Sequence, residues 1–556
     1  MNLNINTKLI SSLEKVFPNS EPAALPRPVK FSLLKDDIAA FQLAVRVEPE
    51  FFLARLDAEI TVDSPLADLI SIRRVDLSPV RLAAINPSDG DYISDQPGMY
   101  PDLLRPAEDG KFHIMCRQWN SFWIEVESTP DTKAGSYPVV FTVTGTVPFA
   151  NEKVSVTIST EVTIVNAILP KQTLKRTEWF HADCIADYYH VEPLSEEHWQ
   201  LVEEQVKLAG RRGINMLLTP IFTPPLDTAV GGERTTMQLM DVTVEKGVYA
   251  FGFDNLRRWI EMGQRCGIEY FEMAHLYTQW GAAHCPKIMA TVDGEYKRIF
   301  GWEDDSNGAR YRGFLNAMLP ALTKFLEEMG LKDKTVFHIS DEPTSAHLEL
   351  YKEVRDQVAD LLKGWVVMDA LSDYRYYTEG VCELPVVATN HVTPFLEGKR
   401  PEEFWVYYCV SQGYEVSNRF MAMPSYRNRI IAEQLYKYQV KGFLQWGYNF
   451  YNSQYSLKHL DPFANTDSDG GFPAGDAFAV YPGDGGKPWS SIRLEVFWEA
   501  MCDLRAFNLL ESLAGRDFVM GLIESEGEVT FFEYPRNADY HLKLRRRVNE
   551  EIAKRI

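Results

Sequence analysis

The sequence lacks the features that would mark it as a nucleic-acid-binding or membrane protein. Positive charge is scarce, because 57 Lys and Arg stand against 78 Asp and Glu and leave a net charge of −21. An acidic surface repels phosphate backbones and anionic lipids, so we expect no nucleic-acid partner and no membrane partner. No apolar run approaches the roughly 18 residues of a membrane span.

Paired cysteines and a leader segment are also missing. The seven cysteines are scattered and contain no Cys-x-x-Cys pair, which argues against a zinc ribbon or a disulfide framework. The opening segment, MNLNINTKLISSLEKVF, has no basic stretch followed by an apolar run. We therefore expect a cytoplasmic location, and a trimmed precursor would leave the same sequence.

The first part of the chain, from about residue 27 to residue 169, has the pattern of short β-strands. Apolar and polar residues alternate with a period of two, and turn residues separate the segments. The expected strands are 31–34, 41–47, 58–62, 70–75, 122–126, 139–144 and 154–165. This pattern predicts an N-terminal β-sandwich domain over residues 1–170.

The pattern changes after Pro170, where apolar runs alternate with helical stretches. The runs are 177–182, 215–220, 270–276, 335–340, 365–371, 384–390, 404–410 and 442–449. Such runs indicate strands buried on both faces, as parallel strands are. Eight β-then-α units without a Gly-rich phosphate loop favour a (β/α)8 barrel over an open sheet. We assign the barrel to residues 171–515 and a C-terminal helical extension, expected to be a solvated tail, to residues 516–556.

Functional groups of such barrels collect where the strands end. The fourth run turns polar at His338 and ends in the adjacent acids Asp341 and Glu342, just before Pro343. Like charges held close raise one another's pKa, and a carboxyl that stays protonated near neutrality suits general-acid catalysis. The alternative is that both acids only cap a helix N-terminus.

If the acidic pair belongs to a glycosidase, the position of a further carboxylate decides the mechanism of hydrolysis. An ordinary retaining glycosidase holds a nucleophile about 5–5.5 Å from its acid. The seventh and eighth runs carry no acid in their C-terminal halves, whereas the fifth offers Asp369 and Asp373. The pattern favours a 2-acetamido sugar that attacks its own anomeric carbon through the amide oxygen, and a pair with Asp369 or Asp373 remains open.

Three segments carry a resemblance to a known family. In chain order, His338-Ile-Ser-Asp-Glu-Pro, Trp405-Val-Tyr407 and Gly442-Phe-Leu-Gln-Trp446-Gly-Tyr-Asn449 resemble motifs of glycoside hydrolase family 123. Further matches are Tyr100-Pro-Asp, Ala134-Gly-Ser-Tyr and Ser490-Ser-Ile-Arg-Leu-Glu-Val-Phe, so the resemblance covers most of residues 30–512. Members of that family are β-N-acetylgalactosaminidases with a β-sandwich before a (β/α)8 barrel.

The resemblance implies a retaining, substrate-assisted β-N-acetylhexosaminidase that releases terminal β-linked N-acetylgalactosamine and needs no metal or organic cofactor. Asp341 would orient the 2-acetamido group, and Glu342 would be the general acid/base. Tyr407 would hydrogen-bond the acetamido oxygen, Trp446 would stack on the sugar, and Asn449 would bind a hydroxyl. The other expected substrate contacts are His338, His181, Trp405 and Asn390, and for Asn390 a satisfied loop pair is an equal alternative.

Other interpretations compete with this one. His181, Asp183 and His284-Cys285 lack the spacing of a standard metal site, so sugar contacts or loop packing are preferred for them. Val406 and Tyr408 depart from the family's seventh-strand motif, which predicts a different subsite wall. The rival functions are a glycosidase of the same architecture on β-GlcNAc or a non-acetamido sugar, and a non-catalytic carbohydrate-binding protein.

Overall fold

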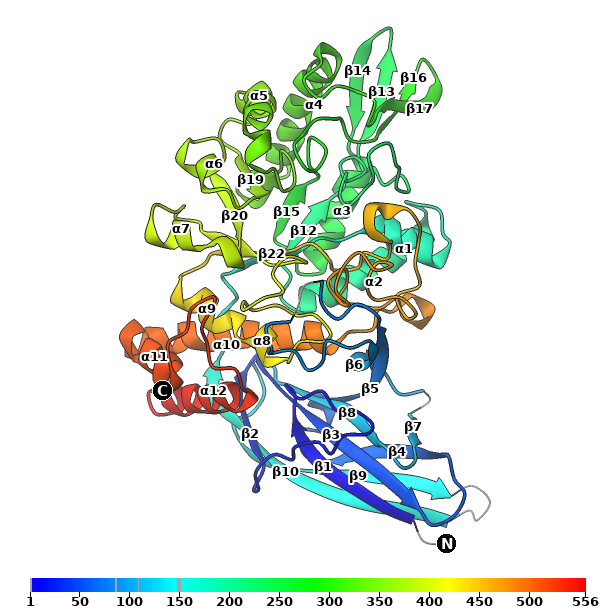
Figure 1. The fold of residues 1–556 in the computed structure, drawn as a ribbon, viewed down its shortest axis with the longest axis vertical. Helices are drawn as coiled ribbons and strands as arrows, with labels where there is room; N and C mark the ends of the chain where they lie inside the picture. Colours follow the sequence, from blue (N-terminus) through cyan, green and yellow to red (C-terminus); the bar gives the residue numbers. More distant parts are fainter. Residues whose placement is uncertain (1–2, 86–87, 109, 148–151) are drawn as a thin grey trace. The chain divides into compact units, whose positions relative to one another are not determined.

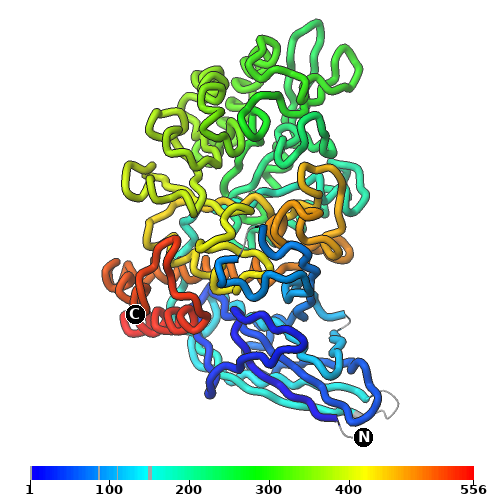
Figure 2. The backbone as a smooth tube through the Cα atoms, in the orientation of Figure 1, coloured from blue at the N-terminus to red at the C-terminus, as the bar shows by residue number. Residues whose placement is uncertain are grey.

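The computed structural model describes residues 3–85, 88–108, 110–147 and 152–556 (Figures 1 and 2). Contacts divide the chain into two compact units. Unit 1 comprises Met1–Gln172, Tyr414–Tyr438 and Trp489–Ile556, and unit 2 comprises Thr173–Gly413 and Gln439–Pro488. The three predicted domains are continuous along the chain, and their boundaries stay a prediction.

Unit 1 contains two five-stranded sheets. The first has the order β1 (Leu3–Ser11), β3 (Ile38–Pro49), β8 (Trp119–Glu127), β5 (Ile70–Val80) and β6 (Gly98–Arg105). The second has the order β2 (Lys30–Lys35), β10 (Glu152–Ile168), β9 (Gly135–Val147), β4 (Arg55–Asp63) and β7 (Phe112–Met115). All seven predicted strands are present, whereas β1, β6 and β7 were not predicted.

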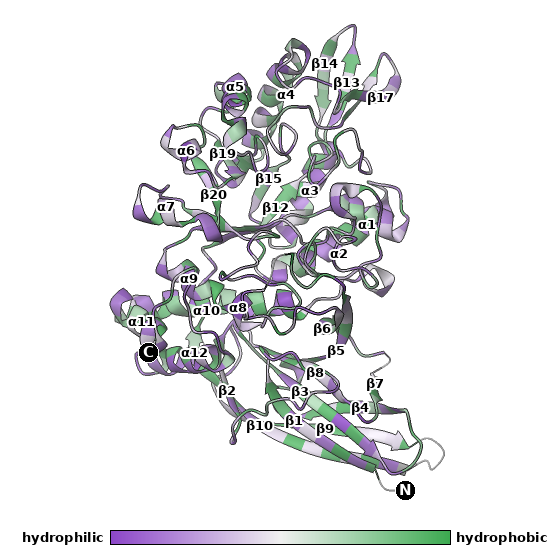
Figure 3. Cartoon of the chain, viewed as in Figure 1, coloured by the Kyte–Doolittle hydropathy of each residue, from purple (hydrophilic) through white to green (hydrophobic). Residues whose placement is uncertain are grey.

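Side chains from both sheets contribute to one hydrophobic core. Phe41 of β3 stacks on Phe31 of β2 at 4.2 Å between ring centroids and meets Phe141 of β9 edge-on at 5.9 Å. Apolar and polar residues alternate along β9 and β10, as the colours of Figure 3 show, because successive side chains of a strand point to opposite faces. The β-rich N-terminal region is confirmed, and the sandwich arrangement stays a prediction.

Unit 2 is built on a closed barrel of eight parallel strands. In barrel order they are β11 (Lys175–Glu178), β12 (Met216–Thr219), β15 (Tyr270–Met273), β18 (Thr335–Phe337), β19 (Val366–Ala370), β20 (Leu384–Ala388), β21 (Trp405–Tyr407) and β22 (Gly442–Gln445). Each strand overlaps one predicted run, so the eight-stranded parallel barrel is confirmed.

Helices follow the barrel strands. Unit 2 contains α1 (Ala182–Tyr189), α2 (Glu196–Arg211), α3 (Asp254–Arg265), α4 (Ala309–Glu328), α5 (Leu348–Ala359), α6 (Tyr374–Thr378) and α7 (Thr393–Glu397). Ser195 begins α2 as expected, because its hydroxyl accepts a hydrogen bond from the backbone N–H of His198. None of the helices in the described part of the chain combines the length and apolarity needed to span a bilayer.

The loops after β12 and β15 carry an additional sheet that the sequence did not predict. Its order is β14 (Val248–Gly252), β13 (Asp241–Glu245), β16 (Ile288–Val292) and β17 (Glu295–Phe300). A long segment also follows β22, from residue 446 to residue 488, and contains the short helices η5 (Gln454–Ser456) and η6 (Asp484–Gly486). These insertions add structure at the end of the barrel where its parallel strands terminate.

The other helices belong to unit 1: α8 (Tyr426–Arg429), α9 (Ile431–Lys437), α10 (Ile492–Ala514), α11 (Arg516–Ile523) and α12 (Ala538–Ala553). Within α10, the Arg493 guanidinium donates to both carboxylate oxygens of buried Asp102, at 2.8 and 2.9 Å. Asp102 ends the Tyr100-Pro-Asp motif and Arg493 lies in the Ser490 motif. Two segments of the resemblance that are far apart in sequence therefore form one buried ion pair.

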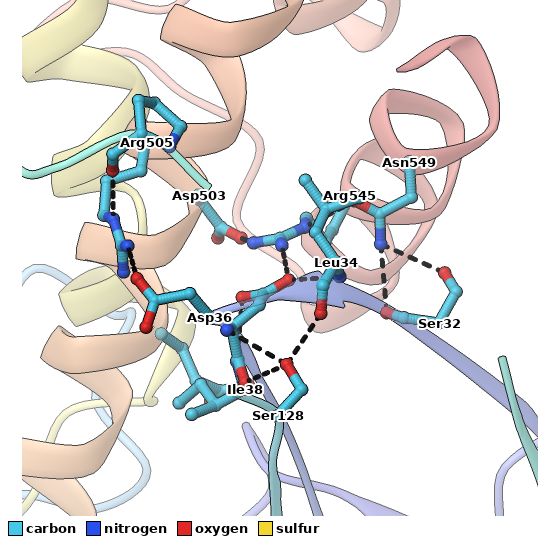
Figure 4. A network of polar contacts seen from close by, with 12 residues as sticks. Ser32, Leu34, Asp36, Ile38, Ser128, Asp503, Arg505, Arg545 and Asn549 are labelled. Atoms are coloured by element: carbon cyan, nitrogen blue, oxygen red, sulfur yellow. Dashed lines mark hydrogen bonds and ion pairs between the residues drawn. The ribbon is translucent and has the colours of Figure 1, made fainter. Parts of the chain in front are cut away.

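The expectation of a solvated C-terminal tail is wrong. Helix α12 lies beside β2 and β10 (Figure 2), and its side chains at 540, 541, 544, 545, 548, 549 and 552 are buried. Arg545 binds Asp37 and donates to Asp503 at 2.9 Å, and Asn549 donates to the Ser32 carbonyl at 3.0 Å (Figure 4). Most charged residues of α12 are exposed and concealed its buried face, on which Arg545 is buried and paired.

We expect Arg545→Leu to lower the free energy of unfolding by about 3–5 kcal/mol, because it leaves the buried Asp37 carboxylate without its guanidinium partner. Urea unfolding followed by circular dichroism measures the change. The control is Arg546→Leu, whose side chain is 65% exposed and which should shift the unfolding free energy by less than about 0.5 kcal/mol. Equal effects of the two substitutions would contradict the role given to Arg545.

Candidate active site

The acidic pair lies directly after β18, held by the neighbouring strands. The Ser340 hydroxyl donates to the Thr278 carbonyl at 2.8 Å, and the Asp341 carbonyl accepts from the Trp280 N–H at 2.9 Å. On the other side, the Glu342 N–H donates to the carbonyl of Ala370 at the end of β19, at 3.0 Å. These bonds fix the backbone of both acids at the end of the barrel where the strands terminate.

Glu342 has an unusual backbone conformation and a specific side-chain partner. Its φ of +43° lies in the left-handed region, which costs a non-glycine residue of order 1 kcal/mol and persists where surrounding contacts enforce it. The Tyr407 hydroxyl, at the end of β21, donates to Glu342 Oε1 at 2.7 Å. Strands β18 and β21 thus bring the predicted acid and the predicted tyrosine into direct contact.

Both carboxyls of the pair have raised pKa values. Burial raises the pKa of Asp341 well above its usual range; the neighbouring Glu342 charge raises it further, and the positive charge of His338 opposes the rise. Burial also raises the pKa of Glu342, while the Tyr407 hydroxyl opposes the rise. Because the two sites interact, their protons leave in two steps that belong to the pair. The arrangement favours one ionised and one protonated carboxyl, which is what an acid/base pair requires.

A buried charged cluster supports the pair from inside the barrel. His338 Nε2 lies 3.1 Å from Glu272 Oε2, and His338 Nδ1 lies 3.4 Å from Asp369 Oδ1. Burial alone would lower the pKa of His338, but its contacts with Asp369 and Glu272 outweigh burial and raise the pKa to about 9. His338 is fully buried; its raised pKa favours the protonated ring, and its contact with substrate stays a prediction.

The same cluster offers a set of metal-ligand types. Ligand atoms of His275, His338 and Asp369 lie within 4.8 Å of one another, and neither ring nitrogen of His275 has a hydrogen-bond partner among the described residues. The two imidazoles, however, stack with centroids 4.4 Å apart and planes at 23°. An ion in the plane of one ring would lie well outside the plane of the other. The geometry fits a neutral imidazole stacked on a cationic one rather than two ligands of one ion.

Around β22 and β11, the predicted sugar contacts form one cluster. The Trp446 indole N–H donates to Asp476 Oδ2 at 3.0 Å, which fixes the ring. His181 Nε2 lies 2.9 Å from the Trp446 carbonyl, and the His181 backbone N–H donates to Asn449 Oδ1 at 2.8 Å. Trp446, His181 and Asn449 are thus brought together, and their contacts with substrate stay predictions.

His181 is held neutral by a buried arginine. Arg234 Nη2 lies 3.0 Å from His181 Nδ1, and the same guanidinium donates to both oxygens of Asp183 at 2.8 Å. Burial and then the Arg234 charge lower the pKa of His181 to about 3. Since Asp183 and His181 Nδ1 are both committed to Arg234, their contacts fit loop packing rather than metal ligation.

The remaining predicted contacts lie in different environments. Trp405 is 1% exposed and packs in the barrel interior, where any side chain at Gly442 would collide with its indole ring. Asn390 lies in η4 (Thr389–His391) and accepts from Gln412 Nε2 at 2.8 Å, as a satisfied loop pair does. Neither residue contacts the acidic pair through a recorded bond, and their roles as substrate ligands stay predictions.

The two carboxylates proposed as an opposing partner are engaged elsewhere. Asp369 Oδ1 accepts from the Ile339 N–H at 2.9 Å, and Asp369 Oδ2 accepts from the Tyr351 hydroxyl. Asp373 is the N-cap of α6 and pairs with Arg375 at 2.6 Å. Since Asp369 is buried and Asp373 caps a helix, neither is placed as a free nucleophile facing Glu342.

The sequence model of the glycoside hydrolase 123 catalytic domain matches residues 179–510, more than half of the chain. The chain belongs to glycoside hydrolase family 123. A search of curated proteins finds no match. Family membership makes the chain a glycosidase with a carbohydrate substrate.

Among solved structures, this family 123 chain is similar to a family 123 glycoside hydrolase from Clostridium perfringens, described for glycolipid glycan hydrolysis. The TM-score is 0.71 at 14% identity, and the match covers 99% of this chain and 98% of that one, which shows a shared fold. A Parabacteroides merdae β-glucuronidase (TM-score 0.31, 10% identity, 89% and 51% covered) and a Rhizomucor miehei family 5 mannosidase (TM-score 0.33, 11% identity, 60% and 94% covered) are far more distant.

The sequence reasoning missed several polar residues of this candidate site. They are Glu272, His275, Asp227, Arg234 and Asp476. Glu272 lies in an otherwise apolar strand and His275 lies just after it. A charged residue inside an apolar run indicates a buried polar cluster, so the sequence could have predicted these two residues. The other three lie in long loops, where no periodicity predicts which side chains turn toward the barrel.

Proposed function

We propose that the chain is a retaining β-N-acetylhexosaminidase that releases terminal β-linked N-acetylgalactosamine, with the acetamido group of the substrate as the nucleophile. The observation that carries the proposal is the adjacency of Asp341 and Glu342 on one strand end, with raised pKa values. A protein nucleophile faces the acid across the sugar ring, and the two other candidate carboxyls, Asp369 and Asp373, are engaged by Ile339, Tyr351 and Arg375. Asp341 and Glu342 are suited to act on a substrate that supplies its own nucleophile.

In the first step, the acetamido oxygen attacks the anomeric carbon while Glu342 donates its proton to the glycosidic oxygen, so the bond to the leaving group breaks. The product is an oxazolinium ring fused to the sugar. The Asp341 carboxylate accepts the amide N–H and stabilises the positive charge that develops there. In the second step, water attacks the anomeric carbon, Glu342 takes its proton, and the acetamido group is restored.

The surroundings support these two roles. The positive charge of His338 opposes the rise in the pKa of Asp341, and the N–H of a bound acetamido group would lower that pKa further by donating to the carboxylate. The Tyr407 hydroxyl binds Glu342 at 2.7 Å, and from there it is suited to reach the acetamido oxygen that the family resemblance assigns to it. The Trp446 ring, fixed by Asp476, is suited to stack on the sugar.

A panel of aryl glycosides tests the proposal. The p-nitrophenyl β-glycosides of N-acetylgalactosamine and N-acetylglucosamine are compared with those of galactose and glucose. We expect a higher kcat/KM on the N-acetylgalactosaminide than on the other three glycosides. We also expect inhibition by the matching thiazoline, a stable mimic of the oxazolinium. Cleavage of plain galactosides or glucosides with both acetamido sugars untouched would overturn the proposal and favour a glycosidase for another sugar. Binding of sugars without turnover of any would favour a carbohydrate-binding protein.

We expect Tyr407→Phe to move the alkaline limb of the pH profile upward. The Tyr407 hydroxyl lowers the pKa of Glu342, so its loss raises that pKa, and Glu342 keeps its proton to a higher pH. The measurement is kcat/KM against pH on a glycoside with a poor leaving group. The control is Tyr408→Phe, whose ring packs on Phe443 at 5.0 Å and should leave the limb in place. If the alkaline limb of Tyr407→Phe moves to lower pH, the result would contradict the role of Tyr407 in lowering the pKa of Glu342.

A further inference from the structure

We propose that Trp280, Tyr455 and Asp227 form a subsite for the aglycone sugar, the residue that leaves when the glycosidic bond is cut. The inference rests on the proposed function and extends it to an oligosaccharide substrate whose second sugar is bound by the protein. The three residues come from three different loops of unit 2, after β15, β22 and β12 respectively.

The two aromatic side chains form an exposed surface. Trp280 is 41% exposed and Tyr455 is 40% exposed, which is unusual for large rings. Their rings meet edge to face with centroids 5.8 Å apart and planes at 89°. Each ring therefore supports the other while both remain open to solvent.

This surface is joined to the catalytic pair through the backbone. The Trp280 N–H donates to the Asp341 carbonyl at 2.9 Å, so the residue that carries the indole is bonded directly to the acid that holds the acetamido group. The preceding residue, Gln279, donates from Nε2 to the Thr228 carbonyl at 2.9 Å, which ties the loop after β15 to the loop after β12. The loop that carries the indole is therefore anchored to the backbone of the catalytic pair.

Asp227 anchors Tyr455 and supplies a polar group. The Tyr455 N–H donates to Asp227 Oδ2 at 3.1 Å, and the Ser456 hydroxyl donates to the Asp227 carbonyl at 2.7 Å. The Ala229 N–H closes the contact by donating to the Tyr455 carbonyl at 2.9 Å. Burial raises the pKa of Asp227 to about 7. The Asp227 carboxyl also lies close enough to Asp341 to raise the pKa of Asp341. Within the described part of the chain Asp227 Oδ1 accepts no hydrogen bond, and it is suited to a sugar hydroxyl.

All three residues have left-handed backbone conformations. The φ angles are +57° at Trp280, +62° at Tyr455 and +39° at Asp227. Glu342 also has a positive φ, of +43°. Each costs a non-glycine residue of order 1 kcal/mol, and such residues cluster at ligand sites where tertiary contacts hold them. Backbone contacts such as the bond from Tyr455 N–H to Asp227 and the bond from Trp280 N–H to Asp341 hold these conformations in place.

The chemistry of the surface fits a pyranose. A sugar ring has an apolar face of C–H groups that stacks on an aromatic ring, and hydroxyls around its edge that bind carboxyls. The cluster assigned to the cleaved sugar contains Trp446, directly after β22, and His181, after β11. Trp280 and Asp227 follow β15 and β12, the next strands in barrel order, and Tyr455, in the loop after β22, extends to them through its bond to Asp227. The surface formed by Trp280, Tyr455 and Asp227 is therefore suited to bind the sugar that follows the cleaved N-acetylgalactosamine in the oligosaccharide.

The test compares two substrates that differ only in the leaving group. One is a disaccharide with β-linked N-acetylgalactosamine, and the other is the β-azide of the same sugar, whose leaving group is too small to reach the subsite. We expect Trp280→Ala and Tyr455→Ala each to lower the ratio of kcat/KM on the disaccharide to kcat/KM on the azide by about tenfold. Trp280→Phe, which keeps a ring, should retain most of the ratio.

Tyr296→Ala is the matched control, because Tyr296 is 64% exposed on β17 of the additional sheet and should leave the ratio unchanged. A ratio that stays at the wild-type value in both Trp280→Ala and Tyr455→Ala overturns the subsite while the proposed function stands. Wild-type protein that hydrolyses neither substrate overturns the proposed function and the subsite with it. If Trp280→Ala does not fold, Tyr455→Ala decides the question.

Discussion

Asp341→Asn is expected to lower kcat/KM by about 10³-fold on every substrate, whatever its leaving group. The acetamido group is the nucleophile in all cases, and an asparagine amide removes the negative charge that would stabilise the oxazolinium. The loss should therefore be as large on an activated aryl glycoside as on a disaccharide. Initial rates on both substrates, with circular dichroism to verify folding, measure the effect.

Asp373→Asn is the matched control for this substitution. Asp373 caps α6 and pairs with Arg375 at 2.6 Å, so we expect a change in kcat/KM of less than about twofold. The control also tests the rival mechanism, in which Asp373 serves as the partner of Glu342. A loss at Asp373 that matches the loss at Asp341 would favour the rival.

Glu342→Gln is expected to have an effect that depends on the leaving group. Glutamine cannot donate a proton to the glycosidic oxygen, so kcat/KM on a disaccharide should fall by about 10²–10⁴-fold. A dinitrophenyl glycoside needs little protonation to leave, and its first step should fall far less. Steady-state rates on a series of aryl glycosides of graded acidity measure this dependence, and an equal loss across the series would contradict the role of Glu342 as acid.

The pH profile provides the second readout of Glu342→Gln. Burial raises the pKa of Glu342 above its ordinary value, so the active protonated form persists to higher pH than for an exposed glutamate and is lost as pH rises through that pKa. Wild-type kcat/KM on a disaccharide should therefore have an alkaline limb that Glu342→Gln lacks. The control is Glu349→Gln on α5, where the carboxyl is 85% exposed and the limb should remain.

The barrel could be predicted from the sequence because most of its strands lie in largely apolar runs. Each of the eight runs, such as 335–340 and 384–390, overlaps an observed strand, since burial on both faces leaves a continuous signal. Strands β6 and β7 were not predicted, because β6 contains Pro101 and β7 spans only four residues. Helix α12 was misjudged because most of its charged residues are exposed, and composition alone cannot distinguish the buried Arg545, paired with Asp37, from a solvated charge.

The candidate site could be predicted only as far as it follows strand ends. Asp341, Glu342 and Tyr407 lie at such ends, and the structure brings Glu342 and Tyr407 into contact. Asp227 and Tyr455 lie in loops whose paths depend on tertiary contacts such as the Tyr455 N–H bond to Asp227. Such pairings join residues more than 200 positions apart, and neither spacing nor periodicity predicts them.

The most direct test of the central claim is to weaken the proposed nucleophile within the substrate. Aryl β-glycosides carrying N-acetyl, N-fluoroacetyl, N-difluoroacetyl and N-trifluoroacetyl groups differ little in size, but each fluorine withdraws electrons from the amide oxygen. If that oxygen attacks the anomeric carbon, kcat/KM falls steeply and progressively along the series. A kcat/KM that stays constant across the four substrates would show that the acetamido group does not attack, and would contradict the account.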